Sequence, residues 1–149
     1  MSDIASGGRI EGKTFVWPVR IYYEDTDLGG VVYHANYLRY MERARTEFFR
    51  ALGLAAAYPD DPVPCFWALR KAALDYIRPA KFNDLLEVRT TVVGLSGARL
   101  EARQQIFCDG VLLVDGQVQA CIISLSGKPK RIASAVSDKI LPFLSETVA

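Results

Sequence analysis

One broad apolar stripe runs through residues 37–52 and limits the folds open to this chain. Apolar residues recur at positions 37, 41, 44, 48 and 52, others flank them at 38, 40, 49 and 51, and Gly53 follows as a helix stop. At about 100° per residue, this arc covers roughly half of the helix circumference, which is wider than a surface helix needs. The pattern therefore predicts a helix wrapped by a sheet.

Strand patterns lie on both sides of the helix. Residues 15–23 are rich in β-branched and aromatic side chains, with Pro18 marking an edge or a bulge. Four further runs follow the helix, at 65–77, 85–95, 100–108 and 111–125. Ser96-Gly97 and Asp109-Gly110 are typical hairpin turns, and the alternation of apolar and polar residues in 86–92 favours an antiparallel sheet with one covered face. We expect an α+β fold, with a long central helix wrapped by a curved antiparallel sheet of about five strands.

The length of 149 residues suits one domain. We expect residues 1–14 to form a flexible N-terminal leader and residues 15–149 to form a single domain. A loop rich in proline and aspartate is expected at 58–64, and a short helix at 137–144.

Charge and cysteine content narrow the class of function. A net charge of +1 gives no electrostatic case for binding nucleic acid or an acidic membrane. The three cysteines are widely spaced among apolar residues, so we expect free buried thiols and a cytoplasmic protein. The sequence contains no pattern typical of a signal peptide and no apolar run that approaches the length of a membrane span.

The segment between the first strand and the helix has the composition of a site. Asp25, Thr26 and Asp27 favour a turn, and the two glycines that follow allow the backbone to approach a ligand. Asn36 is a candidate N-cap, and free N–H groups at a helix start favour a developing oxyanion. His34, the only histidine, lies between the turn and the helix. We predict a small-molecule site here.

Metal and cofactor sites are not favoured. The spacing from Asp25 copies part of a calcium loop, but Gly29 and Asn36 then occupy two ligand positions. One histidine and three scattered cysteines do not have zinc spacing. The sequence lacks a serine-nucleophile elbow, a Walker loop and a dinucleotide fingerprint. We therefore expect no metal and no bound cofactor.

Each candidate residue also has a structural interpretation. His34 has the alternative of a hydrogen-bonded structural histidine, and a strand tyrosine such as Tyr23 is usually a packing residue. Turn capping is the alternative for Asp27, although it describes Asp25 better. Arg45 lies within the apolar arc of the helix, so we expect it to pair with Glu42.

The motifs resemble a known family. Residues 17–37 (WPVRIYYEDTDLGGVVYHANY) and 40–47 (YMERARTE) closely resemble the Tol-Pal-associated acyl-CoA thioesterases, in the 4-hydroxybenzoyl-CoA thioesterase branch of the hot-dog superfamily. Segments 73–80 (ALDYIRPA) and 84–88 (DLLEV) are similar to the family too, so the resemblance extends over about 17–125. It implies the hot-dog fold, a homodimer with active sites at the subunit interface, and dimers often paired into tetramers. Apolar positions on the second sheet face, Val93, Phe107 and Ile123, also favour an oligomer.

The resemblance implies hydrolysis of a short- to medium-chain acyl-CoA, or of an acyl carrier protein thioester, to free acid and thiol. The family's catalytic aspartate, tyrosine and histidine fall on Asp27, Tyr23 and His34. The carboxylate acts either as a general base or as a nucleophile, and the sequence leaves both open. Other hot-dog thioesterases carry this carboxylate on the helix, where Glu42 is available.

Two groups of residues are candidates for binding substrate. Backbone N–H groups at Gly30 and Val31 are candidate oxyanion donors. Basic side chains suited to the phosphates of coenzyme A are Arg78, Lys128, Lys130 and Arg131, with Lys81 as a further choice. Two alternative functions remain at this point: a hot-dog enoyl-thioester hydratase and a non-catalytic module that binds acyl-CoA or acyl carrier protein.

Overall fold

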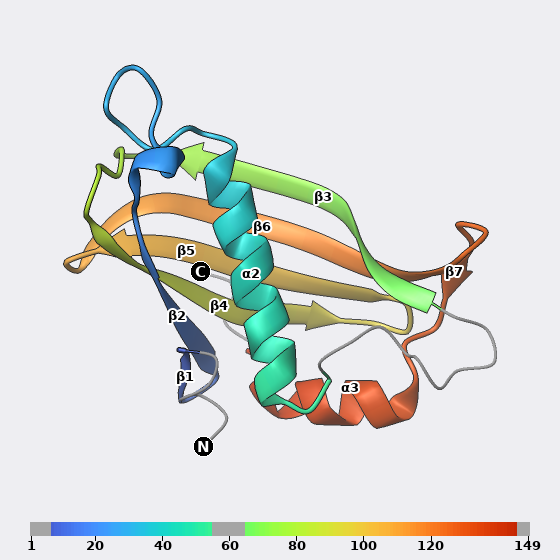
Figure 1. Cartoon of the computed structure of the whole chain (residues 1–149). Helices are drawn as coiled ribbons and strands as arrows, with labels where there is room; N and C mark the ends of the chain where they lie inside the picture. The colour runs from blue at the N-terminus through green and yellow to red at the C-terminus, as the bar shows by residue number, and fades with distance from the viewer. Residues whose placement is uncertain (1–6, 55–64, 146–149) are drawn as a thin grey trace.

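The computed structural model describes residues 7–54 and 65–145, so the loop expected at 58–64 lies outside the described residues. Strands β1 and β2 and a 3-10 turn precede helix α2, and the other strands follow it (Figure 1). The bounds are β1 Arg9–Glu11, β2 Thr14–Arg20, η1 Tyr23–Asp25, α2 Asn36–Ala51, β3 Cys65–Tyr76, β4 Leu85–Leu95, β5 Arg99–Cys108, β6 Val111–Ser124, β7 Pro129–Lys130, α3 Ser134–Ile140 and η2 Leu141–Phe143.

The described strands form one antiparallel sheet of seven strands, in the order β1-β2-β4-β5-β6-β3, with β7 paired to β6. The prediction of about five strands is therefore too low, and α2, with 16 residues, is shorter than the long helix that we expected. The two missed strands are three and two residues long, and β1 lies within the segment 1–14 that we expected to be a leader. The last helix, α3, starts and ends earlier than predicted.

Strand β3 joins the sheet out of sequence order. It follows α2 directly in the chain but pairs with β6, from Cys65 opposite Ser124 to Tyr76 opposite Val114. Strands β4, β5 and β6 follow β3 in the chain and form the predicted antiparallel meander. The crossover leaves β3 at one end of the sheet order, and β1 at the other.

Helix α2 lies across one face of the curved sheet, as its apolar arc predicted (Figure 1). Its side chains Tyr40, Met41, Ala44 and Phe48 are buried together with sheet residues that include Phe15, Leu86, Ile106 and Ile122. Gly116 of β6 faces Met41, where a Cβ would lie 2.8 Å from the methionine Cε. The glycine therefore allows close contact between helix and sheet.

Arg45 has a different partner from the one predicted. Its guanidinium donates to Oε1 of the fully buried Gln104 at 2.8 Å, while Glu42 accepts from the Thr46 hydroxyl. Gln104 also donates to the Met41 carbonyl and the Thr90 hydroxyl. Burial lowers the pKa of Arg45, and the Glu42 charge opposes that shift. The predicted ion pair is wrong, because the amide of Gln104 reaches the guanidinium from the sheet.

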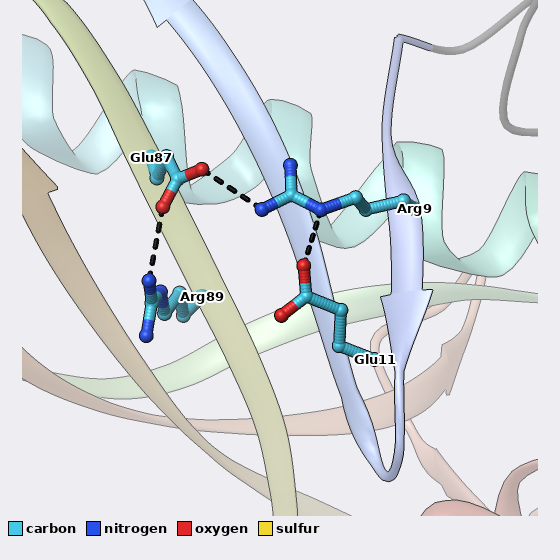
Figure 2. Close-up of polar contacts among 4 residues, drawn as sticks. All are labelled: Arg9, Glu11, Glu87 and Arg89. Carbon is cyan, nitrogen blue, oxygen red and sulfur yellow. Dashed lines mark hydrogen bonds and ion pairs between the residues drawn. The ribbon is translucent and has the colours of Figure 1, made fainter.

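Ionic contacts stabilise the β1 edge of the sheet (Figure 2). Arg9 of β1 bonds to Glu11 and donates to Glu87 of β4 at 3.0 Å, and Arg89 donates to the other Glu87 oxygen at 3.0 Å. The Arg89 guanidinium also lies over the Phe107 ring, 4.6 Å from its centroid. Phe107, an apolar residue on the outer face of the sheet, is thus half-buried beneath the guanidinium of Arg89.

The β3 edge differs. Along the side away from β6, β3 has no strand neighbour within residues 7–54 and 65–145. The middle of the strand is exposed on both faces, and Leu69 retains 46% of its accessible surface. Within the same described ranges, no helix has the length and apolar character needed to cross a membrane.

Candidate active site

The Asp27 turn is a tight, self-bonded loop. Thr26 forms a bridge with Val32, the Asp27 N–H donates to the Val31 carbonyl at 2.9 Å, and the Gly30 N–H donates to the Asp27 carbonyl at 3.0 Å. Gly30 has φ of +79°, which explains the glycine at this position. The turn holds the exposed Asp27 at a fixed place beside the sheet.

One oxygen of the Asp27 carboxylate makes a structural contact, and the other is available to a ligand. Its Oδ1 accepts the Gly29 N–H at 2.8 Å, so Asp27 caps its own turn. Asp25 caps the preceding turn by accepting the Tyr22 N–H at 2.7 Å. Because Oδ2 of Asp27 accepts no hydrogen bond from another described residue, it is the oxygen available to a ligand.

The start of helix α2 is attached to the same turn. Asn36 is the first residue of the helix and not its N-cap; Ala35 is the N-cap and makes no side-chain capping bond. The Asn36 amide donates to the Asp25 carbonyl at 2.9 Å instead. The N-cap prediction is wrong, because this amide reaches across to the turn and so links helix and turn.

A cavity of about 280 Å³ brings several predicted residues together. Its predicted members are Asp27, Val31, His34 and Arg78. It is completed by Val32, Tyr37, Tyr76, Ile77 and Pro79. A carboxylate, an imidazole and a guanidinium thus face one small space with apolar and aromatic walls, as expected for a small-molecule site.

The cavity wall is well anchored at Tyr37. This side chain is 2% exposed, and its hydroxyl oxygen accepts the Ala80 N–H at 3.1 Å. Burial raises the pKa of Tyr37, although the bond from Ala80 opposes that shift. Deeper in the core, burial and the Asp25 carboxylate together raise the pKa of Tyr40. Both phenols therefore remain neutral at physiological pH.

The candidate oxyanion donors differ in availability. The Gly30 N–H is already bonded to the Asp27 carbonyl. The Val31 N–H has no hydrogen-bond acceptor among the described residues, and Val31 lines the cavity. Val31 is therefore the better placed of the two.

Tyr23 lies apart from the cavity lining. It belongs to the 3-10 turn before Asp27, is 79% exposed, and stacks on Phe82 with ring centroids 4.3 Å apart. Glu42 is also outside the lining and lies on the exposed side of α2.

The basic residues near the C-terminus are at the other end of the sheet. Lys128 is bonded to Ser124, which pairs with Cys65 at the start of β3, whereas the cavity lies at Tyr76. At about 3.3 Å per residue, the length of β3 separates these ends by roughly 36 Å. Lys130 in β7 and Arg131 beside Gly97 belong to the same distant end (Figure 1). Within one subunit, Arg78 lines the cavity, and Lys81 forms a bridge with the cavity residue Val31.

Sequence reasoning missed Tyr37 and Tyr76 as cavity residues. Tyr37 was assigned to the core stripe, and Tyr76 lay inside the family-like segment 73–80 without a role. The position of Tyr76 two residues before Arg78 was the available signal. In the part of the chain that the structure describes, no three histidine, cysteine or acidic residues gather as a metal site would require.

Comparisons with known proteins identify the family of this chain. A family model described as thioesterase-like superfamily matches residues 21–140. The acyl-CoA thioesterase YbgC of Haemophilus influenzae is 40% identical over 119 residues, covering 80% of this chain and 87% of that protein. The acyl-CoA thioester hydrolase YbgC of Escherichia coli O157:H7 is 38% identical over 125 residues, covering 82% and 92%.

A solved structure extends the likeness to three dimensions. The probable thioesterase from Bartonella henselae superposes with a TM-score of 0.75 at 37% identity, covering 80% of this chain and 97% of that one. The family match spans most of the chain, including the Asp27 turn, α2 and β3 to β6. The chain therefore belongs to the thioesterase-like superfamily and has the hot-dog fold that its sequence predicted.

Proposed function

We propose that the protein hydrolyses acyl-CoA thioesters to a free acid and coenzyme A. The observation that carries this proposal is the single cavity that contains both Asp27 and His34. The two YbgC relatives, which bear the names acyl-CoA thioesterase and acyl-CoA thioester hydrolase, support the substrate class. Short- to medium-chain acyl groups are the proposed substrates, with an acyl carrier protein as an alternative thioester donor.

Asp27 is the proposed catalytic carboxylate. With Oδ1 occupied by the Gly29 N–H, Oδ2 acts in one of two ways. It takes a proton from a water that attacks the thioester carbonyl, and the C–S bond breaks to release coenzyme A. Alternatively it attacks the carbonyl itself, expels coenzyme A as the thiolate and forms a mixed anhydride that water then hydrolyses to the free acid. In both routes the carbonyl oxygen gains negative charge. The Val31 N–H is the proposed donor to that oxygen, and one such donor is typically worth about 10²- to 10³-fold in turnover.

His34 and Tyr23 are the proposed companions of Asp27. His34 lines the cavity and would orient the water or the carbonyl. Tyr23 would act from outside the cavity lining, where its ring is exposed beside Phe82. Arg78 offers its cation to the phosphates or the acyl carbonyl.

A second copy of the chain completes the site in this proposal. Antiparallel pairing of two β3 edges would reverse one strand relative to the other, so Tyr76 would lie near the partner's Cys65. The basic segment that includes Lys128, Lys130 and Arg131 lies at that end. Dimerisation would thus carry these cations toward the partner's cavity, where they would meet the phosphates of coenzyme A.

The finer assignments also belong to this proposal. These are membership of the Tol-Pal-associated group within the 4-hydroxybenzoyl-CoA branch, a tetramer formed from two dimers, a cytoplasmic location and a role in lipid metabolism. Residues 17–47 carry the branch assignment, because the family-like motifs are concentrated there.

The decisive test is a thiol-release assay on a panel of acyl-CoAs, comparing the native protein with Asp27→Asn. The amide preserves shape but neither accepts a proton nor forms an anhydride, so kcat should fall by about 10² or more. Glu42→Gln is the matched control, because that carboxylate lies outside the cavity. Native kcat in Asp27→Asn would exclude the catalytic role.

The same assay separates the alternative functions. A hydratase would change the enoyl absorbance of an unsaturated acyl-CoA without releasing thiol. A binding module would retain acyl-CoA, detected by calorimetry, with no turnover in the native protein. Thiol release that depends on Asp27 excludes both.

A further inference from the structure

Tyr76, the last residue of β3, makes two contacts with His34. Its hydroxyl donates to the His34 carbonyl at 3.1 Å. Its ring meets the imidazole edge-on, with centroids 6.4 Å apart and an interplanar angle of 90°. The side chain therefore contacts both the backbone and the ring of the only histidine in the chain.

Tyr76 is itself held by the core. Its ring contacts Tyr37 at a centroid distance of 5.6 Å, and Tyr37 in turn contacts Tyr40 at 6.1 Å. Tyr37 and Tyr40 are almost fully buried on α2. A continuous row of aromatic side chains thus leads from the interior of the protein to His34.

His34 has few other restraints. It is exposed, and its imidazole forms no hydrogen bond with any residue in the described ranges. The next residue, Ala35, is an N-cap without a side-chain bond. Apart from the Tyr33 ring at 4.6 Å, the described contacts of the imidazole are those made by Tyr76. Tyr76 is thus the neighbour that contacts both the ring and the carbonyl of His34.

We propose that Tyr76 is a positioning residue, which holds His34 at the cavity wall for turnover. The proposal rests on the proposed function, in which His34 takes part in thioester hydrolysis. Tyr76 is 49% exposed, so packing alone gives a weak reason for a tyrosine here. The hydroxyl has a specific role, because it holds the backbone carbonyl of His34, the residue whose imidazole must be oriented for turnover.

The variant Tyr76→Phe tests the role of the hydroxyl. It keeps the ring contact and removes one hydrogen bond, so kcat should fall by about 3- to 10-fold, with KM within about twofold of the native value. Tyr33→Phe is the matched control. It also removes a hydroxyl next to His34, but that hydroxyl bonds to no other described residue, and its kcat should stay native.

A single histidine gives a direct spectroscopic reading. The imidazole proton signals in the NMR spectrum of the full chain come from His34 alone. Tyr76→Phe should move or broaden these signals because the backbone anchor is lost, and Tyr76→Leu should move them further because the ring is lost too. Tyr33→Phe, which keeps its ring, should leave them near their native positions.

A double variant tests whether Tyr76 acts through His34. In a His34→Ala background, Tyr76→Phe should cause no further loss of kcat, since the group being positioned is gone. An independent further loss, or unmoved imidazole signals in Tyr76→Phe, would overturn the proposal. Native turnover in His34→Ala would instead overturn the role of His34 in the proposed function, so the two failures are distinguishable.

Discussion

The two edges of the sheet are built differently. At the β1 edge, a three-residue strand covers Thr14–Val16 of β2, Pro18 removes an N–H from the next stretch, and ionic contacts fix Arg9 to Glu87 (Figure 2). At the β3 edge, twelve residues run along the end of the sheet with no strand neighbour in the described chain. A short strand, a proline and charges protect an edge from pairing with other chains, whereas a long bare strand favours it.

The difference indicates where a second copy would attach. Among the strands that the structure describes, β3 is the long one at an end of the sheet, and it carries a cavity residue, Tyr76, at its own end. The family match begins at residue 21, so β1 lies outside it and β3 lies inside. Protection at one edge would therefore direct assembly to the edge that belongs to the shared fold.

The largest expected effect comes from charging the open edge. Ala72→Lys with Ala73→Lys extends the basic pair Arg70-Lys71, so two β3 edges would bring like charges together. Both alanines are exposed, and the subunit should stay folded. Association should weaken by about 100-fold, and thiol release should fall with it.

Sedimentation across a dilution series, run beside circular dichroism and the thiol-release assay, measures this effect. Ala133→Lys with Ala135→Lys adds the same charge at exposed positions near α3 and serves as the control. A folded, fully active monomer of the native protein would contradict the proposed dimer site.

A smaller effect is expected from Gly8→Ala at the protected edge. A Cβ at this position would overlap the ring of Phe15, which is fully buried, so β1 must shift away from β2. Thermal unfolding should show a loss of about 1–3 kcal/mol, as for other overpacked sites, with association unchanged. Adding Phe15→Leu should recover part of the loss; equal stability of Gly8→Ala and native protein would mean that β1 does not need this glycine.

The smallest effect is expected from Glu87→Gln. Hydrogen bonds from Arg9 and then Arg89 lower the pKa of Glu87, so its stabilising contribution is complete above about pH 4.3, its usual unfolded value. That contribution is lost as pH falls through the lower folded-state pKa. Because Glu87 is partly exposed, we expect a loss of about 0.5–1 kcal/mol near pH 7.

Denaturant unfolding at several pH values checks this prediction. The difference between native protein and Glu87→Gln should shrink as the solution becomes more acidic than pH 4 or so. Glu11→Gln is the control, since among the described residues its carboxylate pairs with one arginine, Arg9, and it is more exposed than Glu87. A difference that persists unchanged in acid would show that charge is not its origin.

The helix, the later strands and the Asp27 turn were predictable because their signals are local. Helical and strand periodicities lie within single segments, and the turn chemistry lies within six residues. Strand β1 was missed since three residues are too few to show alternation, and charged neighbours made it resemble a solvated segment. The sequence therefore predicted the strand that forms one edge of the sheet, β3, but not β1, which forms the other.

Long-range side-chain contacts were not predictable. Arg45 and Gln104 are 59 residues apart, and nothing near either residue identifies the other. The bond from Tyr76 to His34 spans 42 residues and requires the end of β3 to reach the segment just before α2. Motifs singled out only part of the cavity lining, namely Asp27, Val31, His34 and Arg78, whereas Tyr37 and Tyr76 and the contacts that anchor them required the fold.

The crossover of β3 has a consequence for the order in which the protein is made. During synthesis, β3 emerges right after α2, but β6, its only strand neighbour in the described sheet, is completed 48 residues after β3 ends, at Ser124 following Tyr76. In that interval the ribosome has delivered the whole β4–β5 hairpin, which can pair at once. Until β6 arrives, β3 lacks its strand partner in the described sheet, so we expect its unpaired edges to expose the nascent chain to wrong pairing during this interval.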